Sequence, residues 1–198
     1  MGRSPVVLVL KPGLLKRDED GEILDARSTV TLIVSGSRKI LVDTGLAGEE
    51  KIILDGLLRL GLRPEKIDLV INTHMHPDHC GNNHLFTEAE NLSCENYVGY
   101  VSPAVRILKT PGHTTDSISV LSFSERRIVM AGDALPTMNN YLKWVPPRIH
   151  VDFEKAMSSL SIIVRMADIV VPGHDSPFLV KEKRYTNLLD SALSDIRF

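Results

Sequence analysis

The sequence predicts an α+β fold in layers, with two sheets packed face to face and helices on the outside. Two observations support this prediction. Short β-branched runs bounded by turn residues, which are typical of strands, occur throughout the 198-residue chain. Each half also contains a segment with apolar residues at helical spacing. Because no segment has the composition of a linker, we expect residues 1–198 to form a single domain.

The first half contains four predicted strands and one predicted helix. A tight turn at Gly36 and Ser37 joins two of the strands, and the charged residues 16–21 are expected to form a solvated hairpin or loop tip. The helix at residues 49–61 carries apolar residues at helical spacing and ends at Gly61. The expected strands are residues 6–10, 28–36, 38–45 and 67–73.

The second half repeats this pattern. A helix is expected at residues 152–167, with Asp152 as its N-cap, and a second one at residues 181–197. The expected strands are residues 98–110, 116–123, 126–133 and 168–173.

The amino-acid composition limits the classes of function and the cellular compartment that we expect. A net charge of −2 argues against a large basic surface for nucleic acid. The two cysteines, Cys80 and Cys94, form no CxxC pair, and no apolar run approaches the roughly 18 residues of a membrane span. We therefore expect a cytoplasmic protein without a membrane partner, and the sequence leaves a homodimer open.

Five apolar strands end in a small-residue turn that carries an acidic or imidazole side chain. Strand ends that point the same way would gather these groups at one edge of the sandwich, where loops on a rigid scaffold form sites. The five segments are "ILVDTG" with Asp43, "LVINTHMHPDH" with His74 to His79, "ILKTPGH" with His113, "IVMAGD" with Asp133 and "IVVPGH" with His174.

The central segment has the pattern His-x-His-x-Asp-His. In an extended chain His74 and His76 point to the same side and can reach one ion. The turn at Pro77 then directs Asp78 and His79 towards a second ion. Imidazoles and carboxylates without thiolates suit zinc, and also iron or manganese. His84 and Cys80 lie nearby, but we do not expect them to be ligands.

Together these motifs resemble the metallo-β-lactamase superfamily in its form with a complete dinuclear site. The resemblance runs from about Thr29 to Phe178 and implies a four-layer αββα sandwich that holds two zinc ions. In this resemblance Asp43 supports the site without binding metal. The implied ligands are His74, His76 and His113 for one metal, Asp78, His79 and His174 for the other, and Asp133 as a bridge.

This ligand set predicts hydrolysis of an ester-type bond by a metal-bridging hydroxide. Asp78 and Asp133 are the expected catalytic residues, with Asp78 placed to handle the proton in transit. The segments "GNNHLF", "TPGHTTDSISV", "VMAGD" and "ADIVVPGHDSPF" resemble a narrower group within the superfamily. Members of that group have been assigned endoribonuclease activity, so an RNA phosphodiester is one candidate substrate.

Residues 134–151 form the longest irregular connection expected in the chain, and we predict that they border the substrate. Their side chains suit single-stranded RNA or a small-molecule ester, and the candidate contacts are Tyr141, Trp144, Arg148 and His150. Three alternatives remain open at this stage. They are a thioesterase or lactonase acting on a small acyl substrate, a mononuclear iron persulfide dioxygenase, and a metal-stabilised binding protein without activity.

Overall fold

The computed structural model describes residues 4–93 and 99–188. Its strands are β1 Val6–Lys11, β2 Leu14–Arg17, β3 Ile23–Arg27, β4 Val30–Ser35, β5 Arg38–Val42, β6 Leu69–Ile71, β7 Glu90–Leu92, β8 Tyr100–Ser102, β9 Val105–Lys109, β10 Ile118–Phe123, β11 Arg127–Gly132, β12 Ile169–Pro172, β13 Phe178–Leu179 and β14 Arg184–Tyr185. Its α-helices are α1 Glu50–Arg59, α2 Pro77–Cys80, α3 Met138–Lys143 and α4 Phe153–Met166, with 3-10 turns η1 Pro64–Lys66 and η2 Asn83–Leu85.

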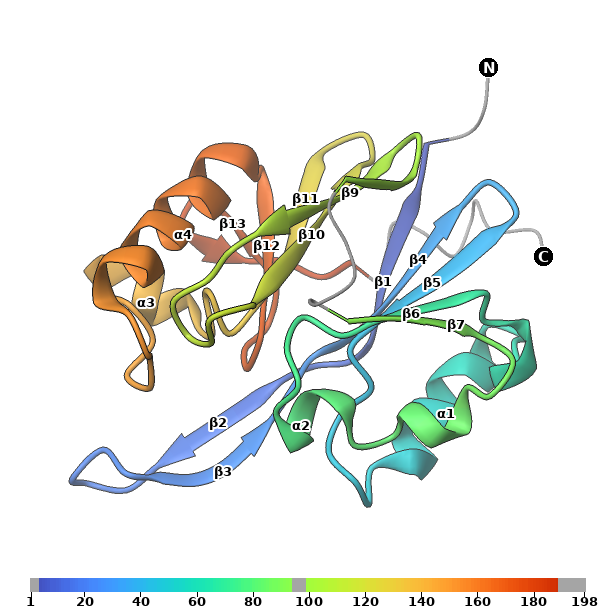
Figure 1. The fold of residues 1–198 in the computed structure, drawn as a ribbon, viewed down its shortest axis with the longest axis horizontal. Helices are drawn as coiled ribbons and strands as arrows, with labels where there is room; N and C mark the ends of the chain where they lie inside the picture. The colour runs from blue at the N-terminus through green and yellow to red at the C-terminus, as the bar shows by residue number, and fades with distance from the viewer. Residues whose placement is uncertain (1–3, 94–98, 189–198) are drawn as a thin grey trace.

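The strands form two large sheets and one separate hairpin. One sheet has the order β1-β4-β5-β6-β7, and the other has the order β14-β13-β12-β11-β10-β9-β8. Neighbours are antiparallel except β5 with β6, β6 with β7, and β11 with β12. Strands β2 and β3 pair only with each other and project from the body, at the lower left of Figure 1.

Three apolar clusters separate the layers. The first lies between the sheets and includes Ile33 from one sheet and Val120 from the other. The second packs α1 against the five-stranded sheet through Leu57. The third packs α3 and α4 against the seven-stranded sheet through Leu160. Helices therefore cover the outer face of each sheet (Figure 1), and the αββα sandwich is confirmed.

Local sequence signals explain where the two long helices begin and end. The Asp152 carboxylate accepts a hydrogen bond of 3.0 Å from the Lys155 amide, so Asp152 caps α4 as predicted. Helix α1 stops just before Gly61, whose φ of +69° is a left-handed conformation that glycine adopts without strain. No helix within residues 4–93 and 99–188 has both the length and the apolar character to cross a membrane.

The structure differs from the sequence prediction in three places. Residues 181–188 form a turn and strand β14 where a helix was expected, because Tyr185 pairs with Phe178 at the sheet edge. The rest of that predicted helix, residues 189–197, lies outside the described residues. The run from Tyr100 onward is two strands, β8 and β9, joined by a turn; the start of that prediction, Val98, is also outside. The segment predicted to be irregular contains α3.

A buried ion pair joins β1 to the start of α1. The Lys11 ammonium lies 2.9 and 2.8 Å from the two carboxylate oxygens of Glu49, and both residues are 4% exposed. Glu49 also accepts a hydrogen bond from the Leu46 amide and lies 3.6 Å from the Arg27 guanidinium. This pair anchors the loop that follows β5, where the first of the predicted site residues is found.

We predict that Lys11→Met lowers the free energy of unfolding by at least about 2 kcal/mol, because it leaves the Glu49 carboxylate buried with one distant cation. The double substitution Lys11→Met with Glu49→Leu should recover most of this loss, since no buried charge is then left unpaired. Urea unfolding of the three proteins measures the difference. If the double variant is as unstable as Lys11→Met, the packing of the Lys11 side chain is the cause and not its charge.

Candidate metal centre

All seven predicted metal ligands come together at one end of the sandwich. His74, His76, Asp78 and His79 follow β6 and enter α2, and Asp133 follows β11. His113 lies between β9 and β10, and His174 follows β12. Three groups of side chains have their donor atoms within 4.8 Å of one another, namely His74 with His76 and His113, His74 with His79 and Asp133, and Asp78 with His79 and His174.

The first group is a cluster of three imidazoles. His76 Nδ1 lies 3.1 Å from His74 Nε2 and 3.0 Å from His113 Nε2. In the group of Asp78, His79 and His174, the His174 Nε2 atom lies 3.4 Å from His79 Nε2 and 3.4 Å from a carboxylate oxygen of Asp78. Each group thus presents three donor atoms to a common point.

Asp133 lies between the two groups. Its Oδ1 is 3.4 Å from His79 Nε2 and 3.1 Å from His174 Nε2, and its Oδ2 is 3.4 Å from His113 Nε2. Among the described residues, Oδ1 is buried and accepts no hydrogen bond. A buried carboxylate oxygen that accepts no hydrogen bond is available to bind a cation.

Hydrogen bonds outside the cluster fix which nitrogen of each ring faces inward. His79 Nδ1 donates to Asp43 at 2.8 Å, His113 Nδ1 to the Ile149 carbonyl at 2.8 Å, and His174 Nδ1 to the Arg27 carbonyl at 3.0 Å. A neutral ring that donates from Nδ1 keeps its lone pair on Nε2. Each Nε2 thus faces the other donor atoms and can bind a divalent cation once it carries no proton.

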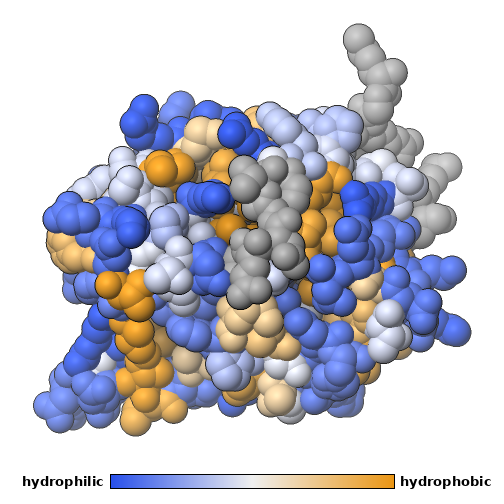
Figure 2. All heavy atoms as spheres, viewed as in Figure 1, coloured by the Kyte–Doolittle hydropathy of each residue, from blue (hydrophilic) through white to orange (hydrophobic). Residues whose placement is uncertain are grey.

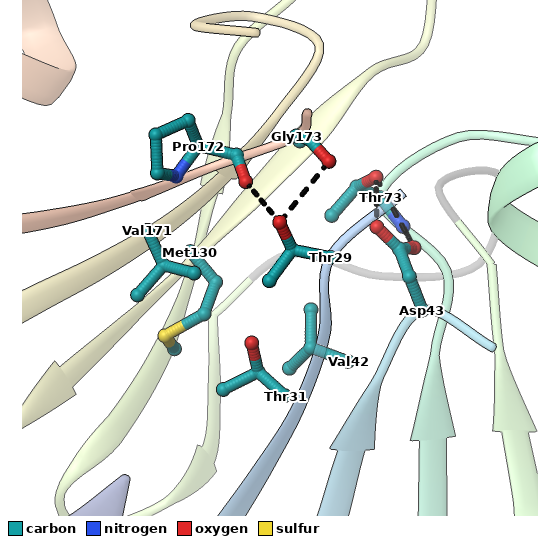
Figure 3. A pocket seen from close by; sticks show the side chains of 10 residues that line it. Thr29, Thr31, Val42, Asp43, Thr73, Met130, Val171, Pro172 and Gly173 are labelled. Carbon is teal, nitrogen blue, oxygen red and sulfur yellow. Dashed lines mark hydrogen bonds between the residues drawn. The ribbon is translucent and has the colours of Figure 1, made fainter. Parts of the chain in front are cut away.

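Asp43 supports this arrangement from behind, on the side away from the donor atoms. It accepts hydrogen bonds from the Thr73 amide at 2.8 Å and the Thr73 hydroxyl at 2.9 Å, in addition to the one from His79 (Figure 3). Its φ of +58° is a left-handed conformation, which costs a non-glycine residue on the order of 1 kcal/mol or more. The three bonds hold the carboxylate in place against this strain.

Two glycines let the strand ends approach closely. A Cβ atom at Gly132 would lie 2.5 Å from the Thr73 hydroxyl, and one at Gly173 would collide with the Asp133 carboxylate. The Thr29 hydroxyl donates to the Pro172 carbonyl at 2.8 Å and holds the end of β12 just before His174 (Figure 3). A small cavity of about 10 Å³ separates these groups from the core between the sheets.

The close packing of these ionisable side chains shifts their pKa values in the metal-free centre. Burial lowers the pKa of His74 to about 2, and the neighbouring His79 contributes to the shift. Burial alone would also lower the pKa of His79, but Asp43 and Asp133 raise it well above its ordinary value. Burial opposes ionisation of Asp133, yet His174 and His79 hold its pKa well below the usual range. The negative charge of Asp133 is therefore retained and available to a cation.

A cavity of about 130 Å³ opens over the metal centre. Five of the ligands reach it, and its walls come from the β2–β3 hairpin and from residues 136–149. The lining residues are Leu15, Arg17, Ile23, Ala26, His76, Asp78, His113, Asp133, Pro136, Pro147, Arg148, Ile149 and His174.

Of the four predicted substrate contacts, Arg148 lines this cavity and the other three do not. The Tyr141 hydroxyl donates to the Val180 carbonyl at 3.0 Å, and its ring stacks on Phe178. Trp144 ends α3 and is 46% exposed, and His150 Nδ1 donates to the Pro147 carbonyl at 2.7 Å. Tyr141 lies in α3 and Trp144 is its C-cap, so an unpredicted helix sets the positions of these two side chains.

The hairpin residues of the cavity wall were missed by the sequence analysis, which interpreted this stretch only as a solvated tip. A signal was present, because Ile23 and Leu24 are apolar residues in an otherwise charged segment, and they are 38% and 68% exposed. His84 belongs to none of the three donor groups, and Cys80 Sγ donates to the His76 carbonyl at 3.3 Å, so neither joins the cluster.

Comparison with known proteins identifies the family of this chain. The family described as the metallo-beta-lactamase superfamily matches residues 25–93. A probable metallo-hydrolase from Methanocaldococcus jannaschii is 39% identical over 90% of both chains. Metallo-beta-lactamase domain-containing protein 1 from Xenopus laevis is 34% identical over 90% of this chain and 83% of that protein.

Two more distant similarities concern the fold and the kind of enzyme. An N-acyl homoserine lactonase from a Bacillus species is 28% identical over 78% of this chain and 84% of its own length. A crystal structure of a putative metallo-beta-lactamase from Thermotoga maritima superposes with a TM-score of 0.72 at 20% identity, over 89% of this chain and all of that one. The protein therefore belongs to the metallo-β-lactamase superfamily and is a metal-dependent hydrolase.

Proposed function

We propose that the protein is a dinuclear hydrolase that holds two zinc ions and cleaves a small-molecule carboxylic ester or lactone. The observation that carries this proposal is the position of the Asp133 carboxylate between two donor groups. Its Oδ1 lies 3.1 Å from His174 Nε2 and accepts no hydrogen bond among the described residues, and its Oδ2 lies 3.4 Å from His113 Nε2 and 3.3 Å from His174 Nε2. One carboxylate between two three-donor groups suits two cations better than one.

In this proposal His74, His76 and His113 bind one cation, Asp78, His79 and His174 bind the other, and Asp133 binds both. The cations supply Lewis acidity, which makes a water nucleophilic near neutral pH and polarises the ester carbonyl. Asp78 is partly exposed and lines the cavity, so its carboxylate can accept the proton of the attacking water and return it to the leaving group. Asp43 keeps the His79 ring in the orientation that binding requires.

The shape and chemistry of the cavity favour a small ester over RNA. Outside the ligand set, six of the eight lining residues are apolar and two are arginines, and the neighbouring hairpin tip carries Asp18, Glu19 and Asp20, which repel a polyanion. Figure 2 shows this contrast at the lower left, where apolar surface adjoins a strongly hydrophilic tip. Among the lining residues there is no aromatic side chain other than the metal-site histidines to stack on a base. The similarity to a lactonase also supports an acyl substrate.

A substrate panel tests the proposal. The metal-loaded protein is offered a carboxylic ester, a γ-lactone, a thioester and a single-stranded RNA of equal concentration, and initial rates are compared. Turnover of the ester or lactone is expected to exceed that of RNA by at least about a hundredfold in kcat/KM. Efficient RNA cleavage without ester hydrolysis would contradict the choice of substrate, and persulfide oxidation by a one-iron form would contradict the hydrolytic chemistry.

Metal content gives a prediction about Asp133. Elemental analysis of the wild-type protein should find two zinc ions per chain, and Asp133→Ala should lose at least one of them together with all hydrolysis. The matched control is His84→Ala, which alters a nearby histidine outside the donor groups and should keep both ions. The ligand assignment would be wrong if the wild-type protein held a single, tightly bound iron, or if His84→Ala lost metal.

We predict that Asp43→Asn weakens metal binding by about tenfold to a hundredfold, because the neutral amide no longer holds the protonated Nδ1 of His79. Competition with a chromophoric chelator measures the affinity. Asp68→Asn is a suitable control, since the Asp68 carboxylate also accepts a backbone hydrogen bond, from Lys39, but lies outside the site. Equal affinities for Asp43→Asn and the control would mean that Asp43 has no role in binding.

Metal binding should release protons at pH 7. The pKa values of His79 and His174 are raised in the metal-free protein, against the effect of burial, by Asp43 and Asp133 for His79 and by Asp133 for His174. A raised pKa increases the fraction of each ring that is protonated near neutral pH, and a cation must displace that proton, so affinity rises with pH until these raised pKa values are passed. Calorimetry in two buffers of different ionisation enthalpy detects the released protons, and identical heats in both buffers would refute the prediction.

A further inference from the structure

Two arginines meet on the wall of the cavity, away from the metal ligands. Arg17 Nη1 donates to the Gly21 carbonyl at 2.8 Å, and Arg148 Nη1 donates to the same oxygen. Arg148 Nη2 also pairs with a Glu22 carboxylate oxygen at 2.5 Å. The Glu22 carboxylate pairs with Arg148, and Arg17 makes no ion pair with any described residue, so the positive charge of Arg17 is left unpaired.

The same cavity is lined by three kinds of side chain. Five are candidate metal ligands, two are the guanidinium groups of Arg17 and Arg148, and the rest are apolar. The apolar residues are Leu15, Ile23, Ala26, Pro136, Pro147 and Ile149. A substrate whose ester lies against the metal ligands can therefore place an apolar chain against these side chains and a further polar group against Arg17 and Arg148.

The Arg148–Glu22 pair does not prevent another carboxylate from binding there. The side chains of Arg148 and Glu22 are 51% and 70% exposed, and exposed ion pairs contribute little to stability. A guanidinium group binds a carboxylate through two parallel hydrogen bonds, and a second guanidinium beside it strengthens the attraction. A single carboxylate also matches the one unpaired positive charge.

We propose that the substrate is an ester whose apolar acyl chain ends in a carboxylate, and that Arg17 and Arg148 select it by binding that carboxylate. This inference rests on the proposed ester hydrolase function and names its substrate class. Hydrolysis adds one water across the acyl C–O bond, releases a dicarboxylate and an alcohol, and needs no further reactant. The acidic tip residues Asp18, Glu19 and Asp20 do not line the cavity, and the Asp18 carboxylate accepts a hydrogen bond of 2.7 Å from the Glu22 amide.

A matched pair of esters tests the selection. The 4-nitrophenyl ester of hexanoic acid and the mono-4-nitrophenyl ester of adipic acid have six-carbon acyl groups and differ in the terminal carboxylate. For the wild-type protein we expect kcat/KM to be at least about tenfold higher for the adipate half-ester, through a lower KM, and to fall towards the hexanoate value as salt rises. A ratio near one at low salt would overturn the proposal.

Three variants distinguish substrate selection by the two arginines from a purely structural role in holding the hairpin. Arg17→Gln and Arg148→Gln should each reduce the adipate-to-hexanoate ratio by about fivefold or more, whereas Glu22→Gln should raise it because the competing carboxylate is gone. The matched control, Arg63→Gln, removes an exposed arginine that does not line the cavity and should leave the ratio unchanged. If the arginine variants slow both esters equally, or if Glu22→Gln lowers the ratio, the arginines serve only to hold the hairpin.

Binding of the products provides a readout that does not depend on turnover. Calorimetry with adipate and with hexanoate should show at least about fivefold tighter binding of adipate, and Arg17→Gln should remove this difference. If neither ester is hydrolysed but adipate still binds more tightly through the arginines, the hydrolase proposal fails and the carboxylate site stands. If both esters are hydrolysed and adipate has no advantage, the carboxylate site fails alone.

Discussion

The buried carboxylate of Asp43 accepts three hydrogen bonds, and the position of the candidate metal ligands depends on them. One bond holds His79, and the other two hold Thr73, the residue just before His74. The Thr73 hydroxyl also lies 3.2 Å from His74 Nδ1, so the same chain of bonds reaches both donor groups. The strained backbone conformation of Asp43 is maintained because its carboxylate accepts these three hydrogen bonds.

The ligands come from two sheets, and therefore the sheets must be held in one relative position at this end. The Thr29 amide donates to the Gly173 carbonyl at 2.7 Å, and the Ile118 amide donates to the Thr73 carbonyl at 2.9 Å. Each of these bonds crosses from the five-stranded sheet and its loops to the seven-stranded sheet. Apolar packing holds the two sheets together but is not directional, whereas these hydrogen bonds are directional and set the position of the donor atoms.

Much of the fold and the full cluster of ligands could be predicted from the sequence, because periodicity and strand-end turns are local signals. Asp43, His113 and His174 each follow an apolar strand directly, so their meeting at one edge depends only on strand direction. The cavity wall could not be predicted in the same way. Whether Arg17 or Tyr141 faces the cavity depends on how the hairpin and α3 pack on the body, and that packing is decided by contacts between distant residues, such as Arg148 with Glu22.

The hairpin of β2 and β3 supplies four residues of the cavity wall, yet none of its residues belongs to the three apolar clusters among the described residues. Substitutions along it change the wall without removing atoms from the core or from the ligand set. Natural variation can therefore explore new acyl groups on this hairpin while folding and metal retention stay under separate selection. For the same reason, the hairpin is the segment to randomise or graft when the enzyme is engineered towards another ester.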